Sequence, residues 1–262
     1  MLEHTSPQFL LAQGLQRSEA DPCVYIKRTE AGIVVVGIYV DDLLFTGSDR
    51  SGINDLRAAL ADEFKIKDLG ILHHYLGIAV NRTADGITMS QRQYVVDLLK
   101  QFGMEECHPT ATPLVAKQKL TRDMSPVTDA ELQRMADIPY RSAVGSLMYL
   151  ALATRPDIAN AVRDLARYSH NPGWDHWLGV KHVFRYLQGT KDLGITYTRT
   201  NESLLAYSDS DWANDESTSR SVTGNVFILA NAAITWASRV VVNSTLIDEC
   251  KGGEDSEIAR YV

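Results

Sequence analysis

Residues 33–49 read IVVVGIYVDDLLFTGSD, which places two adjacent aspartates, Asp41 and Asp42, between two apolar segments. Burying unpaired carboxylates would be costly, and neighbouring residues of a continuous strand point to opposite faces of a sheet. Both acids can therefore serve one site only if they lie at a tight turn. The stretch predicts a strand–turn–strand hairpin that carries two carboxylates at its tip.

Two interpretations of this pair remain open from its spacing alone. Two carboxylates at a hairpin tip can hold a divalent metal, which offsets their repulsion and stabilises charge during phosphoryl transfer. Aspartate is also common in hairpin turns that have no chemical role. The spacing of the pair does not distinguish a metal site from an ordinary polar turn. The choice between them depends on the surrounding residues.

Hydrophobic patterning predicts two hairpins before residue 105, each followed by an amphipathic helix. Strands of the first hairpin region are expected at 23–28, 33–40 and 43–46. The first helix should cover 53–64 and begin after an N-cap at Ser48 or Asp49. A second hairpin at 72–80 and 87–90 leads into a helix with an expected capping box formed by Ser90 and Gln93.

The composition changes after residue 104, where prolines interrupt the apolar period. We expect a linker or long loop at 105–138 and three helical segments between 139 and 189. Pro156 suits the start of a helix, and Gly189 suits an end. Strands are expected again at 193–199, 203–209, 222–229 and 233–238.

Overall composition is that of a globular protein, with 45% hydrophobic and 23% charged residues. Its longest apolar stretch is too short for a membrane span, which needs about 20 residues, and no secretory signal is visible. We therefore expect an intracellular protein with no membrane partner. Three scattered cysteines, Cys23, Cys107 and Cys250, form no pair typical of zinc or disulfides and are expected to be buried fillers.

The net charge of −7 is unfavourable for a nucleic-acid binder. However, residues 1–200 carry 22 basic and 23 acidic side chains, whereas 201–262 carry 4 and 10. The acidity is concentrated near the C-terminus, and the rest of the chain is close to neutral.

Residues 39–42, Tyr-Val-Asp-Asp, resemble the YxDD signature of reverse transcriptases. The likeness continues over about residues 15–240 and resembles the Ty1/copia class of retrotransposon Pol polyproteins. The segments that carry it, in order, are SEADPCVYIKR, FKIKDLGILHHYLGIAV, YVVDLLKQFGM, PYRSAVGSLMYLALATRPDIANAV and HWLGVKHVFRYLQGT. This resemblance favours metal chemistry at the aspartate pair.

The resemblance implies an RNA-directed DNA polymerase that uses Mg²⁺ or Mn²⁺ and an RNA or DNA primer–template. In such an enzyme Asp41 would be a ligand of the catalytic metals and Asp42 would support it, with Tyr39 and Val40 near the primer end. The implied reaction is attack of the primer 3′-hydroxyl on the α-phosphate of a deoxynucleotide. Residues 75–77, Tyr-Leu-Gly, are similar to the family's primer grip, although ordinary strand packing explains them equally well.

The helices at 139–189 correspond in the family to the thumb. Arg163 with Arg167, and Lys181 with Arg185, are each four residues apart, so each pair projects from one helix face. Such faces can follow phosphates, although spaced cations can also mark a solvated helix surface. With the family resemblance, we expect phosphate contacts, and the primer-binding set also includes Leu76 and Gly77.

The segments LLAYSDSDWA, SVTGNVFILA and AITWASR resemble the first three strands of the family's RNase H domain. Asp209 occupies the position of its first catalytic, metal-binding carboxylate, with Asp211 as the second choice. A strand-end cap is the alternative role for Asp209. Glu249 sits at the next expected acid, but the surrounding residues match weakly, and Gly252-Gly253 falls where a helix should run.

Both implied active sites lack acids. The family's other polymerase aspartate lies upstream of the YxDD motif, beyond the start of this sequence, and the later RNase H aspartate has no counterpart. We therefore expect the chain to be inactive alone and to need N-terminal polyprotein portions as partners. The alternative is a non-enzymatic remnant that binds nucleic acid or protein.

The expected fold is α+β, in three parts. A partial reverse-transcriptase palm with the YVDD hairpin and primer grip covers 1–88. A helical thumb covers 89–191 and includes the linker at 105–138. A truncated RNase H-like α/β unit covers 192–262. By the resemblance, the protein would act in a cytoplasmic virus-like particle or in the nucleus.

Overall fold

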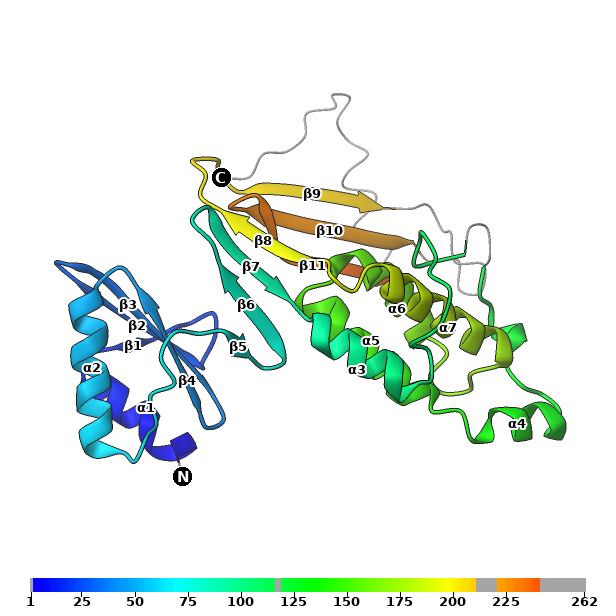
Figure 1. Cartoon of the computed structure of the whole chain (residues 1–262), viewed down its shortest axis with the longest axis horizontal. Helices are drawn as coiled ribbons and strands as arrows, with labels where there is room; N and C mark the ends of the chain where they lie inside the picture. The colour runs from blue at the N-terminus through cyan, green and yellow to red at the C-terminus, as the bar shows by residue number, and fades with distance from the viewer. Residues whose placement is uncertain (1, 116–118, 211–220, 241–262) are drawn as a thin grey trace. The chain divides into compact units, whose positions relative to one another are not determined.

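The structure is a computed structural model, and it describes residues 2–115, 119–210 and 221–240 (Figure 1). It is a mixed α and β structure with antiparallel sheets, and its contacts divide into two compact units with a boundary between Ile71 and Leu72. None of the helices in the described ranges is long and apolar enough to cross a membrane.

The first unit is a four-stranded antiparallel sheet with two helices. Its strands, in the order β1-β2-β3-β4, are Gln16–Arg17, Val24–Thr29, Gly32–Tyr39 and Asp42–Gly47. Helices α1 (Leu2–Ala12) and α2 (Arg50–Glu63) share one core with the sheet. That core consists of Leu10, Leu15, Tyr25, Val34, Val36, Leu56 and Leu60. Because alternate residues of β3 face this core, the apolar run before the aspartates forms a strand anchored on one side.

Helix α2 begins where the sequence predicts. Asp49 is its N-cap, and the carboxylate accepts a hydrogen bond from the Gly52 main-chain N–H at 2.8 Å. Leu56 and Leu60 are its buried residues. Of the two N-caps left open by the sequence, Asp49 is therefore the one used. By contrast, no apolar period in the sequence predicts helix α1.

The second unit combines two sheets with a group of helices. Strands β5 (His74–Tyr75), β6 (Ile78–Arg82), β7 (Gly86–Ser90) and β8 (Gly194–Thr198) form one antiparallel sheet in sequence order. A second antiparallel sheet has the order β11-β10-β9. Its strands are β9 (Leu205–Ser210), β10 (Val222–Leu229) and β11 (Ala232–Val240).

Five α-helices of this unit lie between β7 and β8 in the described sequence. They are α3 (Arg92–Gln101), α4 (Asp129–Ala136), α5 (Tyr140–Ala153), α6 (Ala159–Ala166) and α7 (Trp174–Gly189), with short 3₁₀ turns η1 (Arg122–Met124) and η2 (Pro156–Ile158). Their shared core is built mainly from α3, α5, α6 and α7. Leu98, Leu147, Leu165, Val180 and Phe184 are among its buried members.

Side chains of α7 hold the segment that follows α3. The Gln188 amide donates to the Glu105 carbonyl at 2.6 Å, and the Arg185 Nε donates to the His108 carbonyl at 2.8 Å. His182 Nε2 lies 3.0 Å from the Thr112 carbonyl oxygen. Residues 105–112 therefore lie along one polar row of α7, since these three side chains are three residues apart.

The β9–β11 sheet is fastened to the helices and to β8 by hydrogen bonds. The Trp236 indole donates to the Ala151 carbonyl at 2.7 Å. The Tyr197 hydroxyl donates to the Ala233 carbonyl at 2.8 Å. The two sheets and the helices therefore form one unit.

Several local predictions differ from the structure. The capping box of Ser90 with Gln93 is wrong, because Ser90 is the last residue of β7 and pairs with Gly194, so α3 begins after Gln91. The linker expected at 105–138 contains α4, which a capping box of Thr128 and Glu131 starts. The prediction of buried cysteines is wrong for Cys23, which is exposed, while Cys107 is half-buried. Cys250 lies outside the described residues.

The boundaries that the sequence analysis expects, after residues 88 and 191, differ from the boundary between the two compact units. Residue 88 lies inside β7, and β7 pairs with β8, which follows residue 191. The described residues from 72 onward therefore belong to one unit. The division into palm, thumb and RNase H-like parts stays a prediction about ancestry and role.

Candidate functional site

The β3–β4 hairpin places the aspartate pair at its tip. Tyr39 pairs with Asp42 at the end of the ladder, so Val40 and Asp41 form a two-residue turn. All four side chains of this tip are exposed. Asp41 and Asp42 thus both lie at a tight turn, as the sequence predicts.

The turn contains backbone strain at Val40. Its φ is +51°, in the left-handed region that a β-branched residue rarely adopts. Such a conformation costs on the order of 1–3 kcal/mol and persists only where the surrounding structure enforces it. Here the ladder of β3 and β4 enforces it, because six residue pairs from Val34↔Gly47 to Tyr39↔Asp42 fix the register.

The donor set at this tip is incomplete for a metal ion. Carboxylate oxygens are the ligand type that Mg²⁺ prefers, and Asp41 and Asp42 supply them. Among the residues the structure describes, however, no three His, Cys, Asp or Glu side chains gather in a way that could hold a metal. Within the described part of the chain, the two carboxylates of this tip are therefore not joined by the further ligands that a metal site would need.

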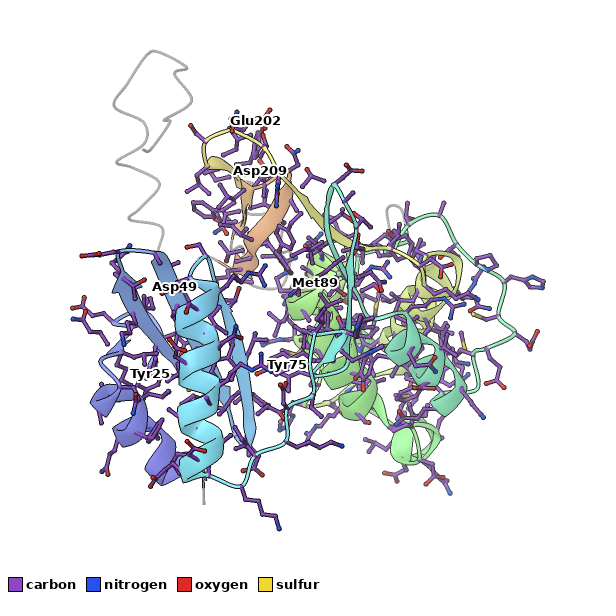
Figure 2. The ribbon with its side chains drawn as sticks, turned by 60° about the vertical axis from the view of Figure 1, so that its left-hand side comes forward. Tyr25, Asp49, Tyr75, Met89, Glu202 and Asp209 are labelled. Carbon is purple, nitrogen blue, oxygen red and sulfur yellow. The ribbon has the colours of Figure 1, made fainter. Side chains whose placement is uncertain are left out.

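The expected primer grip is a second two-residue turn, between β5 and β6. Tyr75 pairs with Ile78, and both turn residues have left-handed φ angles, +50° for Leu76 and +74° for Gly77. The Tyr149 hydroxyl, on α5, donates a hydrogen bond to the Leu76 carbonyl. Figure 2 labels Tyr75 beside this turn. Sequence reasoning missed Tyr149, because no local pattern links residues 73 positions apart.

The two cations expected on α6 and just after it have local partners. Arg163 donates through Nε and Nη2 to the Asp164 carboxylate, and its Nη1 donates to the Ser238 hydroxyl at 3.0 Å. The Arg167 guanidinium lies 5.6 Å from the centre of the Tyr168 ring. Arg163 thus joins α6 to β11, with its charge balanced by Asp164.

The two cations expected on α7 lie beside aromatic rings and a main-chain oxygen. The Lys181 ammonium lies 6.0 Å from the ring centre of Trp174 and 5.9 Å from that of Trp177. Arg185 donates through Nε to the His108 carbonyl, which fixes the direction of its guanidinium. A guanidinium has five N–H donors, so this single bond leaves donors that can bind an anion.

Asp209 lies near the end of β9 and is exposed (Figure 2). It stands opposite Gly224 in the β9–β10 register. The other two acids considered for a nuclease site, Asp211 and Glu249, lie outside the described residues.

The first unit contains a cavity of about 320 Å³ that the sequence did not indicate. Lys27, Thr29, Asp49 and Asp55 are among its lining residues. The Thr29 hydroxyl and the Gly52 amide both donate to Asp49 and hold the pKa of that carboxyl below its usual value. The Lys27 ammonium donates to the Gln13 carbonyl at 2.9 Å. Both charged groups thus have structural partners.

Comparison with known proteins identifies the class. Residues 1–116 match the family model described as reverse transcriptase (RNA-dependent DNA polymerase). The matched region includes the YVDD hairpin and the β5–β6 turn. No solved structure matches the chain.

Relatives extend the match beyond that region. The chain is 39% identical to the retrovirus-related Pol polyprotein from transposon TNT 1-94 of Nicotiana tabacum, over 88% of this chain and 18% of that protein. It is also 39% identical to the Pol polyprotein from transposon RE2 of Arabidopsis thaliana, over 88% of this chain and 16% of that protein. It therefore spans less than a fifth of these polyproteins. An uncharacterized mitochondrial protein of Arabidopsis thaliana is 39% identical over 77% of this chain and 81% of its own length.

The chain belongs to the reverse transcriptase family of Ty1/copia-type retrotransposon Pol polyproteins.

Proposed function

We propose that this chain is the palm and thumb segment of an RNA-directed DNA polymerase, followed by the first strands of an RNase H domain. The observation that carries the proposal is the β3–β4 tip, where Asp41 and Asp42 are exposed at a strained two-residue turn. A two-residue hairpin turn requires a positive φ in any case. This tip differs in having a β-branched valine where Gly, Asn or Asp is usual, and strained residues of this kind cluster at functional sites. The family membership supports the same interpretation.

In this proposal Asp41 and Asp42 contribute carboxylates to a Mg²⁺ or Mn²⁺ site that acids from other parts of a Pol polyprotein complete. Such metals stabilise charge in phosphoryl transfer. Tyr39 and Val40 would lie near the primer end. Because the described donors do not complete a site, we expect no primer extension by this chain alone with either metal. Template-directed incorporation that Asp41→Asn abolishes would contradict this expectation.

The thumb proposal rests mainly on the two cations of α7. Lys181 and Arg185 are four residues apart on α7 and therefore share a face. Arg167, whose guanidinium already contacts the Tyr168 ring, is a third candidate in the proposal. Arg163, which the sequence also suggested, is better explained as the link between α6 and β11. About two or three phosphate contacts would give weak binding that is insensitive to base sequence.

Salt dependence tests the thumb proposal. Anisotropy of a labelled primer–template duplex should give a slope of log K against log salt between about −2 and −3. Lys181→Ala with Arg185→Ala should reduce that slope by about two units. Asp209→Asn is the matched control and should leave the slope unchanged. No duplex affinity at low salt would refute the thumb proposal.

The nuclease part of the proposal places Asp209 as the first metal-binding carboxylate of an RNase H-like domain. Its support is the three-stranded antiparallel sheet, in which β9 carries Asp209 on an exposed strand. The remaining acids would have to come from residues outside the described ranges. The cytoplasmic virus-like particle or the nucleus remains the proposed place of action.

A second candidate function is a non-enzymatic module that binds nucleic acid or protein. The observation that favours it is the mitochondrial relative, since this chain covers 81% of that protein's length. Joining the chain to the upstream region of a related Pol polyprotein, such as that of transposon TNT 1-94, separates the candidates. Primer extension that depends on Asp41 supports the polymerase, whereas duplex binding without extension supports the module.

A further inference from the structure

We propose that Tyr149 is a positioning residue, which holds the β5–β6 turn in the place where that turn contacts a primer terminus. The inference rests on the proposed function, because it assigns the turn of Leu76 and Gly77 to the primer. It adds a residue from α5, far along the chain, as the support of that turn. The observation that carries it is the hydrogen bond from the Tyr149 hydroxyl to the Leu76 carbonyl.

The β5–β6 turn belongs to a short hairpin at the edge of a sheet. β5 is two residues long and pairs with β6 at His74↔Ala79 and Tyr75↔Ile78, with one further bond from the Val80 N–H to the His73 carbonyl at 2.7 Å. Leu76 also adopts a left-handed φ, which is uncommon for a residue other than glycine. A short edge hairpin with a strained tip needs an external contact to stay in one conformation.

Tyr149 provides that contact from a rigid element. Its neighbours Leu147, Leu150 and Ala151 are buried in the core of the second unit, which fixes α5. The Tyr149 ring also packs edge-on against Tyr94 of α3, with ring centres 5.0 Å apart and planes at 76°. Such aromatic pairs are worth about 0.5–1.5 kcal/mol beyond their buried area. The hydroxyl is therefore presented to the turn by two packed helices.

The two helices are also joined close to the turn's own sheet. The Thr154 hydroxyl, which follows α5, donates to the Gln91 side-chain oxygen at 2.8 Å, and both residues are buried. Gln91 directly follows β7, so this bond connects α5 with the sheet that contains β5 and β6. Ser90, the last residue of β7, pairs with Ala79 of β6, so this bond also restricts movement of β6 relative to α5.

Gly77 shows how closely the turn approaches Tyr149. A Cβ at residue 77 would lie 3.3 Å from the Tyr149 hydroxyl oxygen, and the φ of +74° already disfavours a side chain there. Alanine at this position should therefore push the turn away from α5. The Leu76 side chain, which is 39% exposed, remains available to a ligand at the tip.

Position-specific fluorescence on the whole chain tests the inference. The probe is a primer–template duplex with 2-aminopurine either at the primer 3′ terminus or well inside the duplex. We expect Tyr149→Phe to weaken the terminal signal about fivefold, the typical effect of one lost hydrogen bond. The internal signal and the salt slope should not change, because α7 makes the phosphate contacts. A purely stabilising role for Tyr149 would lower both signals together.

Two variants complete the design. Tyr94→Phe is the matched control, because it keeps the ring contact and leaves the Tyr149 hydroxyl in place, so the terminal signal should match that of the unmodified chain. Gly77→Ala should reduce the terminal signal as Tyr149→Phe does, through displacement of the turn. If Tyr149→Phe fails to fold, this second variant still tests the contact.

The outcomes separate the inference from the proposed function. If Leu76→Ala lowers the terminal signal but Tyr149→Phe and Gly77→Ala do not, Tyr149 does not position the turn, although the primer-grip proposal stands. If the duplex binds without any terminal signal, the turn does not contact the primer, and the inference fails with it. If no duplex binds, the proposed function itself is refuted.

Discussion

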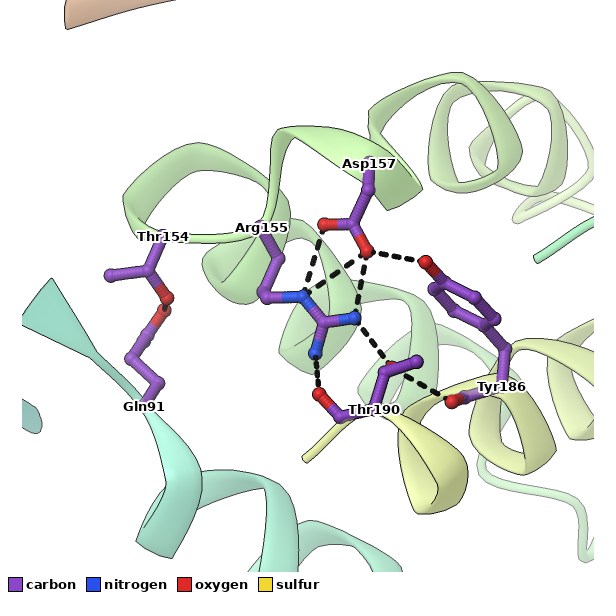
Figure 3. A network of polar contacts seen from close by, with 6 residues as sticks. All are labelled: Gln91, Thr154, Arg155, Asp157, Tyr186 and Thr190. Atoms are coloured by element: carbon purple, nitrogen blue, oxygen red, sulfur yellow. Dashed lines mark hydrogen bonds and ion pairs between the residues drawn. The ribbon is translucent and has the colours of Figure 1, made fainter. Parts of the chain in front are cut away.

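The buried guanidinium of Arg155 forms a bidentate ion pair with the carboxylate of Asp157, which lies only two residues after it in the sequence (Figure 3). The Nε to Oδ1 distance is 3.0 Å and the Nη2 to Oδ2 distance is 2.7 Å. Arg155 also donates to the carbonyl and hydroxyl oxygens of Thr190, and Tyr186 donates to Asp157. This network joins the connection between α5 and α6 to the end of α7.

Asp157→Ala should strongly destabilise the second unit. It leaves the Arg155 guanidinium, which is 2% exposed, without its counter-charge. Breaking a buried pair in this way typically costs about 3–5 kcal/mol. Urea unfolding measures the loss. Asp192→Ala is the control, because its pair with Arg92 is exposed and should contribute less than about 1 kcal/mol. Equal effects of the two substitutions would contradict the importance of the network.

Trp236→Phe should loosen β11 from α5. The substitution removes the indole N–H that donates to Ala151 and keeps an aromatic ring. We expect a loss of about 1 kcal/mol, typical of one hydrogen bond. Hydrogen exchange of β10 and β11 amides should accelerate more than exchange in α7. Unchanged protection of both strands would show that this bond does not fasten the sheet.

Stability should decrease in mild acid because of His176. Its Nδ1 accepts from the Gly173 N–H at 2.8 Å, so Nε2 carries the proton and donates to the Thr121 carbonyl at 3.0 Å. Burial lowers the pKa of this imidazole below its ordinary value of 6.5, while hydrogen bonding to Thr121 and the charge of Asp175 act in the opposite direction. The native state therefore favours neutral His176.

The direction of the pH effect follows from that lowered pKa. Below about pH 6.5 the unfolded chain binds a proton that the native chain excludes, so stability falls until the pH passes the native pKa. The urea midpoint should thus drop between about pH 7.5 and about pH 5.5. His176→Gln should show a smaller drop over the same interval. An identical pH dependence in both proteins would exclude His176 as the cause.

Val40→Gly should raise the stability of the first unit. Glycine adopts the left-handed φ of this turn without the steric cost that valine incurs. We expect a gain of about 1 kcal/mol, after the greater backbone entropy of unfolded glycine is allowed for. Val35→Gly, within the regular part of β3, is the control and should destabilise. A loss of stability at residue 40 would mean that the turn holds valine without strain.

Local patterns in the sequence predicted most strands of this protein and the hairpin with Asp41 and Asp42. Alternation and turn residues report structure within a few positions, so strand β10 at 222–229 matches its expected bounds. The predicted capping box of Ser90 is wrong because Ser90 pairs with Gly194 in the β5–β8 sheet. Helix α4 was missed because its first turn follows a proline-rich segment, although Thr128 and Glu131 form the usual capping pair.

Local sequence patterns could not predict the long-range contacts that position the candidate site. Tyr149 reaches Leu76 across 73 residues, and Arg163 reaches Ser238 across 75. The sequence places Arg163 on a helix face with Arg167, which suggested phosphate binding for both. Only the fold shows that Asp164 and Ser238 already engage the Arg163 guanidinium. Spacing along one helix therefore identified candidate cations but not their partners.

The pairing of β7 with β8 has a consequence for synthesis on the ribosome. Gly86 lies opposite Thr198 and Ser90 opposite Gly194, so this ladder closes only after more than a hundred further residues have emerged. Until then β7 exposes an unpaired edge, which favours association with other chains. Contacts so distant in sequence also slow folding. The second unit should therefore acquire its final sheet late, after its helices have formed, and a nascent chain that stalls before residue 194 should be prone to aggregate.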